Sequence, residues 1–160
     1  MIILLMGVAG SGKTTIGQLL ASQLNWKFVD GDSYHSPENI AKMSAGIPLT
    51  DADRAPWLAA LRASIETWLR TNENIALAAS ALKQKYRDEL LIDPAVKLVY
   101  LRSTPEAIRA RLQARTNHFM NSTLADSQFA DLEEPTNAFT INADLDPNEI
   151  VRSIRSELNL

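Results

Sequence analysis

The sequence predicts an α/β fold in which a central parallel sheet of five strands carries helices on both faces. Three observations predict it. Short apolar runs that suit buried strands alternate along the chain with segments whose apolar residues recur at helical spacing. The glycine-rich stretch 7–14 joins the first apolar run to the first helical pattern. This alternation is typical of a doubly wound sheet, and we expect residues 1–160 to form a single domain.

The expected strands are short and apolar, as strands buried on both faces are. The run 1–6 precedes the glycine-rich stretch, and the next run ends in an Asp-Gly-Asp sequence. The last run has the weakest strand pattern of the five. The five expected strands are 1–6, 26–29, 75–80, 96–101 and 139–142.

Helices are expected between these strands, and several have recognisable start signals. Ser36 and Thr104 each place a capping side chain directly before a proline at the first helical position. Thr50 is a cap that is followed by acids in the first turn, where the helix dipole favours them. The expected helices are about 15–24, 37–44, 51–69, 83–91, 105–116 and 122–132, with a last one from 147 onward.

Composition limits the classes of function. The chain has 160 residues, of which 46% are hydrophobic and 22% charged, as in ordinary globular proteins. A net charge of −3 gives no broad basic surface, so we expect neither nucleic acid nor membrane as a partner. The absence of cysteine excludes disulfides, thiolate metal sites and cysteine catalysis. The first strand begins at Ile2 and no apolar run is as long as a membrane span, so we expect no signal peptide and a cytoplasmic enzyme.

The stretch Gly7-Val8-Ala9-Gly10-Ser11-Gly12-Lys13-Thr14 has the strand-turn-helix context of a P-loop. Backbone N–H groups of such a turn and the following helix N-terminus bind phosphate. Lys13 can reach the outer phosphates, and the Thr14 hydroxyl can ligate Mg²⁺. A dinucleotide fingerprint is excluded because Thr15 stands where its third glycine belongs. We expect a nucleoside triphosphate bound by Gly7, Gly10, Ser11, Gly12, Lys13, Thr14 and Thr15.

Two carboxylates follow the second expected strand. Ligands of a doubly wound sheet bind beyond the carboxyl ends of its strands, so Asp30 and Asp32 should face the P-loop across one cleft. Phosphoryl transfer needs one carboxylate near Mg²⁺ and another that orients or deprotonates the attacking hydroxyl. The third strand ends without an acid, which leaves Asp30 as the metal group, acting through water, and Asp32 as the catalytic carboxylate. The alternative is a solvated Asp-Gly-Asp turn.

His35 and Arg54 are candidates for binding the acceptor. His35 lies three residues after Asp32, where it can bind a hydroxyl, although alone it would be read as an ordinary surface histidine. Arg54 lies at a helix start, against the preference for anions there. It either pairs with Asp51 or Asp53 or recognises an anion, and the sequence leaves both open.

Lys83 and Arg87 are four residues apart, so we expect them on one helix face directly after the third strand. A cation pair there suits an anionic substrate or the transferred phosphoryl group. The alternative is a solvated basic face that pairs with Asp88 or Glu89.

Arg111 and Arg115 repeat this spacing near the end of the next helix. We expect them to act in catalysis, closing over the phosphates as part of a mobile lid at about 115–125 and excluding water. The alternative is a favourable charge at the helix C-terminus.

With these residues in view, the sequence closely resembles the gluconate kinase (gluconokinase) family of small P-loop kinases. The resemblance covers nearly the whole chain in the same order. The P-loop is shared with many families, whereas Ser80-Ala81-Leu82-Lys83 together with Tyr86-Arg87-Asp88 is specific to this one. The departures, at Ala79, at Leu91 and at 115–118, remove no charge that is assigned to chemistry.

The resemblance implies a fold similar to nucleoside monophosphate and shikimate kinases, transfer of the ATP γ-phosphate to the 6-hydroxyl of D-gluconate, and a homodimer. It implies that Asp32 holds or deprotonates the acceptor hydroxyl. The residues around the sugar acid would be His35, Arg54, Lys83 and Arg87, and the lid arginines Arg111 and Arg115, with Arg111 also on the nucleotide.

The alternatives are two other kinase families and a regulatory NTPase, which could be a GTPase or an ATPase. A shikimate-kinase-like protein is expected to carry a Gly-Gly-Gly turn where this chain has Ser80-Ala81-Leu82. Nucleoside monophosphate kinases would show a base-binding region, which is not found. A regulatory GTPase would carry an Asn/Thr-Lys-x-Asp guanine motif, which does not occur. A regulatory ATPase would be distinguished by turnover that ignores sugar acids.

Overall fold

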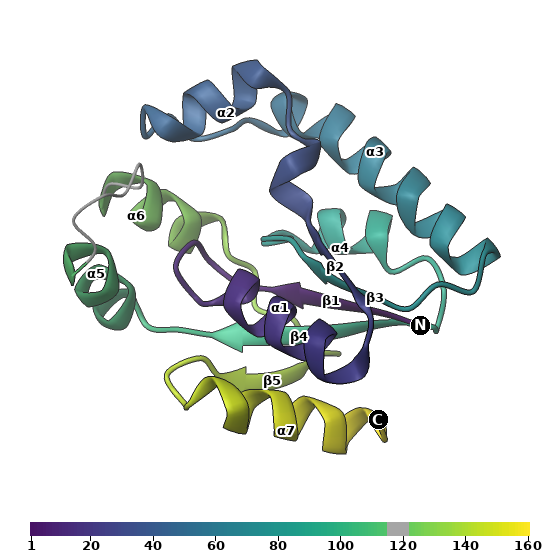
Figure 1. Cartoon of the computed structure of the whole chain (residues 1–160). Helices are drawn as coiled ribbons and strands as arrows, with labels where there is room; N and C mark the ends of the chain where they lie inside the picture. Colours follow the sequence, from purple (N-terminus) through teal and green to yellow (C-terminus); the bar gives the residue numbers. More distant parts are fainter. Residues whose placement is uncertain (115–121) are drawn as a thin grey trace.

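Residues 1–114 and 122–160 are described in the computed structural model, and they form one sheet in which every paired strand is parallel (Figure 1). Its order is β2-β3-β1-β4-β5. The strands are β1 (Ile2–Met6), β2 (Lys27–Asp30), β3 (Ile75–Ala78), β4 (Val96–Arg102) and β5 (Phe139–Asn142). The five-stranded parallel sheet expected from the sequence is therefore confirmed.

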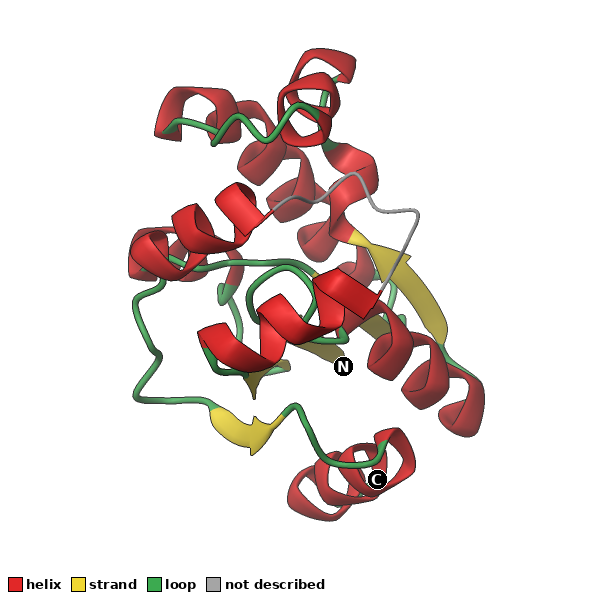
Figure 2. Ribbon diagram, turned by 90° about the vertical axis from the view of Figure 1, so that its left-hand side faces the viewer, coloured by secondary structure: helices red, strands yellow, loops and turns green. Residues whose placement is uncertain are grey.

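Helices lie on both sides of these strands, as Figures 1 and 2 show from two directions. A short 3₁₀ helix, η1 (Gly31–Tyr34), follows β2 directly and was not expected from the sequence. The α-helices are α1 (Lys13–Leu24), α2 (Pro37–Ser44), α3 (Asp51–Arg70), α4 (Gln84–Leu90), α5 (Pro105–Ala114), α6 (Ser122–Asp131) and α7 (Pro147–Leu158).

The central strand β1 is fully buried and supplies side chains to both faces of the sheet. Ile2, Leu4 and Met6 pack with α3 and α4 in one apolar cluster. Ile3 and Leu5 pack in a second cluster with α1 and α7. This alternation follows from the two-residue period of a strand, and it holds the end of β1, where the P-loop begins, in a fixed place.

Helix capping sets the elements above the carboxyl ends of the strands. Ser36 Oγ accepts a hydrogen bond from the N–H of Asn39 at 3.1 Å and starts α2. At α3, Thr50 and Asp53 form a capping box in which each side chain accepts from the other residue's N–H. Lys42 of α2 then pairs with Asp53 at 2.9 Å, which ties α2 to the start of α3.

Most expected boundaries agree with the structure within a few residues. The third strand is shorter than the 75–80 expected, because β3 ends at Ala78 and Ser80 lies in the loop that follows. Residues 115–121 lie outside the described residues, and with them Arg115 and most of the expected lid. In the parts of the chain that are described, no helix has the length and apolar character needed to cross a membrane.

Gly31 permits the close approach of η1 to β3. A Cβ atom there would lie 2.7 Å from the carbonyl oxygen of Ala78, which is backbone and has little freedom to retreat. We expect Gly31→Ala to lower the free energy of unfolding by about 1–3 kcal/mol, because overpacking forces the backbone apart. Urea unfolding measures this loss, and an unchanged midpoint would show that the two segments can separate freely.

Candidate active site

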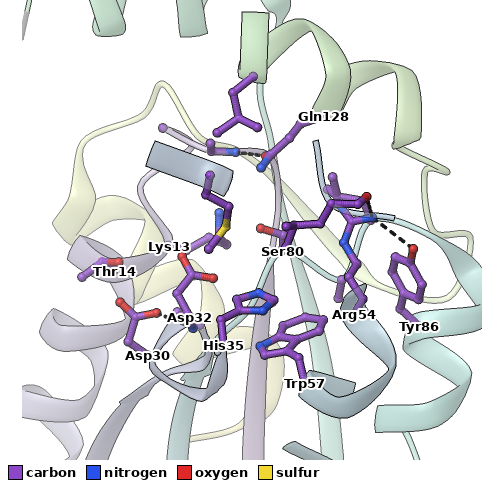
Figure 3. A pocket seen from close by; sticks show the side chains of 18 of the residues that line it. Lys13, Thr14, Asp30, Asp32, His35, Arg54, Trp57, Ser80, Tyr86 and Gln128 are labelled. Carbon is purple, nitrogen blue, oxygen red and sulfur yellow. Dashed lines mark hydrogen bonds between the residues drawn. The ribbon is translucent and has the colours of Figure 1, made fainter. Parts of the chain in front are cut away.

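A pocket opens at the carboxyl ends of the strands, beside β1, from which the chain first builds β2 and β3 on one side and then β4 and β5 on the other (Figure 3). Such a switch point is where ligands bind in open parallel sheets. The pocket is lined by the P-loop with the start of α1, the end of β2 with η1, the end of α2 with the start of α3, the loop after β3 with α4, and α6. The expected residues that line it are Gly10, Gly12, Lys13, Thr14, Thr15, Asp30, Asp32, His35 and Arg54.

The P-loop has the curvature that phosphate binding requires. Gly10 and Gly12 have φ values of +81° and +95°, in the left-handed region that favours glycine. The Lys13 ammonium donates to the carbonyl oxygens of Gly7 and Val8, both at 2.9 Å, so its side chain folds back over the loop. These features fit a nucleotide phosphate, with the α1 N-terminus directed at it.

Neighbouring charges and limited contact with water shape the ionisation of Lys13 and Asp32. Burial lowers the pKa of the Lys13 ammonium, and the carboxylates of Asp32 and Asp30 oppose that change. Withdrawal from water raises the pKa of the Asp32 carboxyl, and Lys13 opposes the rise. The opposite charges of Lys13 and Asp32 therefore each counteract the effect that burial has on the pKa of the other group.

Asp30 and Asp32 project into the same side of the pocket as Lys13 and Thr14 (Figure 3). Asp30 caps η1, because its Oδ1 atom accepts from the N–H of Asp32 at 3.0 Å. This contact orients Asp30 while leaving Asp32 open to the pocket. The Thr14 hydroxyl and these carboxylates are hard oxygen ligands, which fits Mg²⁺ held by few protein groups and by phosphate oxygens.

His35 lines the pocket and is held by Trp57. The two rings stack with centroids 4.7 Å apart and planes 10° apart. The indole Nε1 of Trp57 donates to the carbonyl oxygen of Gly31 at 2.8 Å, so the stack is tied to η1. Burial lowers the pKa of His35, with Asp32 opposing the change and Arg54 adding to it.

Arg54 pairs with neither of the acids that the sequence proposed. Its Nη1 atom donates to the Leu49 carbonyl oxygen at 2.8 Å and to the Tyr86 hydroxyl at 3.2 Å. Its Nη2 atom lies 3.7 Å from Asp131 of α6. Asp53 is taken by Lys42 and the α3 cap. The guanidinium therefore lines the pocket, and in the described part of the chain its carboxylate partner is Asp131.

Asp51 is instead the centre of a surface ion cluster. It accepts from Lys83 at 3.3 Å and from the Tyr86 hydroxyl, and it also pairs with Lys85. These donors hold the pKa of Asp51 well below its usual range. Lys83 also lies 4.0 Å from Asp131, so two carboxylates partly neutralise its ammonium, and Lys83 is not among the residues that line the pocket.

The expected cation pair of Lys83 and Arg87 is wrong. Lys83 precedes α4 as its N-cap, whereas Arg87 is only 1% exposed and does not line the pocket. The Arg87 guanidinium donates to the carbonyl oxygens of Ala81, Leu82 and Glu133 at 2.8–2.9 Å, and to the Gln84 side chain at 2.9 Å. It therefore organises the loop after β3 from inside the protein, which spacing along a helix does not reveal.

Arg111 lies beside the P-loop, outside this pocket. Its guanidinium donates to the carbonyl oxygen of Gly10 at 2.9 Å, to that of Ala143 at 2.9 Å and to Asp144 at 2.6 Å. It joins α5 to the P-loop and to the loop after β5. Of the other expected nucleotide ligands, Gly7 accepts from Lys13, and Ser11 is buried within the loop.

Sequence reasoning missed several pocket residues. Trp57 falls within the helix expected at 51–69 and has no site role in the sequence analysis, although it lies one turn after Arg54 and so shares its side of α3. Tyr86 belongs to the stretch Tyr86-Arg87-Asp88 on which the family resemblance rests, but no role in the site was assigned to it. Gln128 of α6 accepts from the N–H of Ala9 at 2.5 Å, a contact between residues 119 positions apart that no local pattern predicts.

Together, a phosphate-binding loop after β1 and a carboxylate beside its lysine define a P-loop kinase that acts on a small molecule. The family model that matches the chain is described as shikimate kinase and covers residues 9–159. A probable gluconokinase of Mus musculus is 40% identical over 98% of this chain and 97% of its own length. The thermosensitive gluconokinase of Escherichia coli is 47% identical over 82% of this chain and 71% of its own.

Solved structures agree with these relatives. A gluconokinase from Sinorhizobium meliloti superimposes with a TM-score of 0.87 at 40% identity, covering 98% of this chain and 90% of that one. A sugar kinase from Janibacter gives a TM-score of 0.91 at 38% identity, over 99% and 94% of the two chains. A shikimate kinase from Bacteroides thetaiotaomicron is 22% identical, which shows the shared fold alone. The chain belongs to the gluconokinase family, within the broader group that the shikimate kinase model describes.

The structural role of Arg87 can be tested against a role in binding. Arg87→Lys keeps the charge but loses the planar fork that reaches several carbonyl groups, so we expect a loss of about 2–4 kcal/mol in the free energy of unfolding. Urea unfolding measures it. Arg62→Lys is the matched control, because Arg62 is exposed and pairs with Glu66 and Glu89, and it should change stability by less than about 0.5 kcal/mol. Equal effects in both variants would contradict the internal role.

Proposed function

We propose that this protein transfers the γ-phosphoryl group of ATP to the 6-hydroxyl of D-gluconate and forms 6-phospho-D-gluconate and ADP. The observation that carries the proposal is the position of Asp32, which is open to the pocket, close enough to Lys13 for their charges to interact, and on the same pocket as Arg54. The similarity to gluconokinases over nearly the whole chain supports gluconate as the acceptor.

In the proposed reaction, the 6-hydroxyl oxygen attacks the γ-phosphorus and its proton passes to the Asp32 carboxylate. The new bond joins that oxygen to phosphorus, and the bond to the bridging oxygen breaks as ADP leaves. Lys13 and the N–H groups of the P-loop stabilise the charge on the phosphoryl oxygens. The raised pKa of Asp32 makes it a stronger base than an exposed aspartate.

Mg²⁺ would be held by the Thr14 hydroxyl and, through water, by Asp30, and would neutralise charge on the β- and γ-phosphates. At the other end of the pocket, Arg54 would bind the substrate carboxylate, with Lys83 close by and His35 on a hydroxyl group. Arg111, which contacts Gly10, would support the nucleotide side of the P-loop. The proposal includes a homodimer located in the cytoplasm.

The choice of acceptor is tested by ADP release from Mg-ATP with D-gluconate, shikimate, a panel of nucleoside monophosphates, or no acceptor. We expect release only with gluconate. Release with shikimate would instead indicate a shikimate kinase. Release that is independent of any acceptor would indicate a regulatory ATPase and overturn the proposal.

The role of Asp32 is tested by Asp32→Asn. We expect kcat to fall by roughly 10²–10⁴-fold with ATP affinity nearly unchanged, because the variant loses its general base. In the unmodified protein, kcat/KM for gluconate should fall as pH drops through the raised pKa of Asp32, since only the carboxylate accepts the proton, and this acid limb should disappear in the variant. Asp126→Asn, at an exposed ion pair on α6, is the control. Near-normal turnover in Asp32→Asn would leave Asp32 a binding role only.

A further inference from the structure

His35 is contacted on several sides, and one contact involves a side chain outside the pocket lining. One face of its ring stacks on Trp57. Its Nδ1 atom lies 3.3 Å from the side-chain nitrogen Nδ2 of Asn39. That same Nδ2 atom donates to the backbone carbonyl oxygen of Asp53 at 2.8 Å. Asn39 is only 6% exposed, so its amide makes these contacts away from bulk water.

The Asp53 carbonyl determines which way the Asn39 amide faces. A carbonyl oxygen can only accept, so the amide must present its NH₂ group there and not its oxygen. The NH₂ group has two hydrogens: one is used by Asp53, and the second is available to His35 Nδ1. A nitrogen that accepts a hydrogen bond carries no proton, so the proton of a neutral imidazole is then on Nε2.

We propose that Asn39 is a positioning residue that holds His35 as the neutral tautomer protonated on Nε2, and that this N–H donates to an oxygen of the acceptor substrate. The second half of this inference rests on the proposed function. A hydroxyl or carboxylate oxygen of a sugar acid has the lone pairs that such a donor requires. In the described parts of the chain, Nε2 has no hydrogen-bond partner, which leaves it available to a ligand.

The charged groups around His35 are compatible with a neutral ring. Asp32 of η1 favours the protonated form, and Arg54 of α3 opposes it. Asp53 offers His35 no carboxylate, because its side chain is occupied by Lys42 of α2 and by the cap of α3. Burial lowers the pKa of His35 in addition.

Asparagine is well suited to this position. The backbone N–H of Asn39 donates to Ser36 Oγ in the first turn of α2. This bond fixes the backbone from which the Asn39 side chain extends. Aspartate would place an acceptor where His35 and the Asp53 carbonyl both need a donor. Leucine has a similar size but donates to neither.

The tautomer can be measured directly by ¹⁵N NMR of the imidazole nitrogens in the unliganded protein. The chain contains two histidines, so the signals lost in His35→Gln identify His35. Near neutral pH we expect Nδ1 to show the shift of an unprotonated nitrogen and Nε2 that of a protonated one. A proton on Nδ1, or a charged ring, would overturn the proposal. Because no substrate is present, failure of gluconate phosphorylation would leave this result unaffected.

Substitutions then test the part played by Asn39. In Asn39→Asp, a carboxylate accepts from Nδ1–H, so the proton should move to Nδ1 and the titration midpoint of His35 should rise by about one pH unit or more. In Asn39→Leu only the intrinsic preference of a neutral imidazole for Nε2 should remain, so the share of the tautomer protonated on Nδ1 should rise, and kcat/KM for gluconate should fall about tenfold with the KM for ATP unchanged. Asn137→Asp, with the same charge change at an exposed site, is the matched control.

Two results would contradict the role of Asn39. One is a tautomer and midpoint in Asn39→Leu that match the unmodified protein. The other is a shift in Asn137→Asp as large as that in Asn39→Asp, which would reflect net charge alone. If Asn39→Asp does not fold, the tautomers of the unmodified protein and of Asn39→Leu decide the question.

Discussion

The burial of β1 on both faces of the sheet is the constraint on which the site depends. This strand lies between β3 and β4, and its side chains enter the apolar clusters on both sides. Its carboxyl end therefore cannot move without disturbing both clusters, and the P-loop starts from that fixed point. The parallel direction of the neighbouring strands then brings η1 and the loop after β3 to the same edge, where a nucleotide and an acceptor can meet.

The polar groups at this edge are ordered by contacts that come from different segments. The Asp30 carboxylate accepts from the Asp32 N–H, and the Trp57 indole binds the Gly31 carbonyl. Each contact uses a backbone group of η1, so this short helix, which carries the Asp32 carboxylate, is held in a defined position. The shifted pKa values of Lys13, Asp32 and His35 are consequences of this arrangement, because each group is partly withdrawn from water beside the others.

Local pattern was sufficient for the sheet, most helices and the P-loop, because these follow from hydrophobic periodicity and turn chemistry. It also predicted that Asp30, Asp32 and His35 lie at one site, since residues that follow the end of a strand lie at the same edge of the sheet. It failed for Arg87, whose acceptors include the Glu133 carbonyl 46 positions away. It left open whether Arg54 pairs with Asp51 or Asp53 or recognises an anion, and the structure places its guanidinium near Asp131 and not on either of those two acids. Both outcomes depend on where α6 returns to the sheet, which spacing within one helix cannot predict.

The bonds that Arg87 forms have a further consequence for the entropy of the chain. Leu82 accepts from the Glu133 N–H, Gln84 N–H donates to the Glu133 carboxylate, and Arg87 donates to the Glu133 carbonyl. These three bonds close a loop that contains β4, α5 and α6. The entropic cost of bringing the two ends of a chain segment together grows only slowly with its length. Three hydrogen bonds at one residue therefore offset that cost, and they form and break as a reversible cross-link. The same three bonds tie the chain just after α6 to the loop after β3, so α6 and this loop, which both line the pocket, keep or lose their places together.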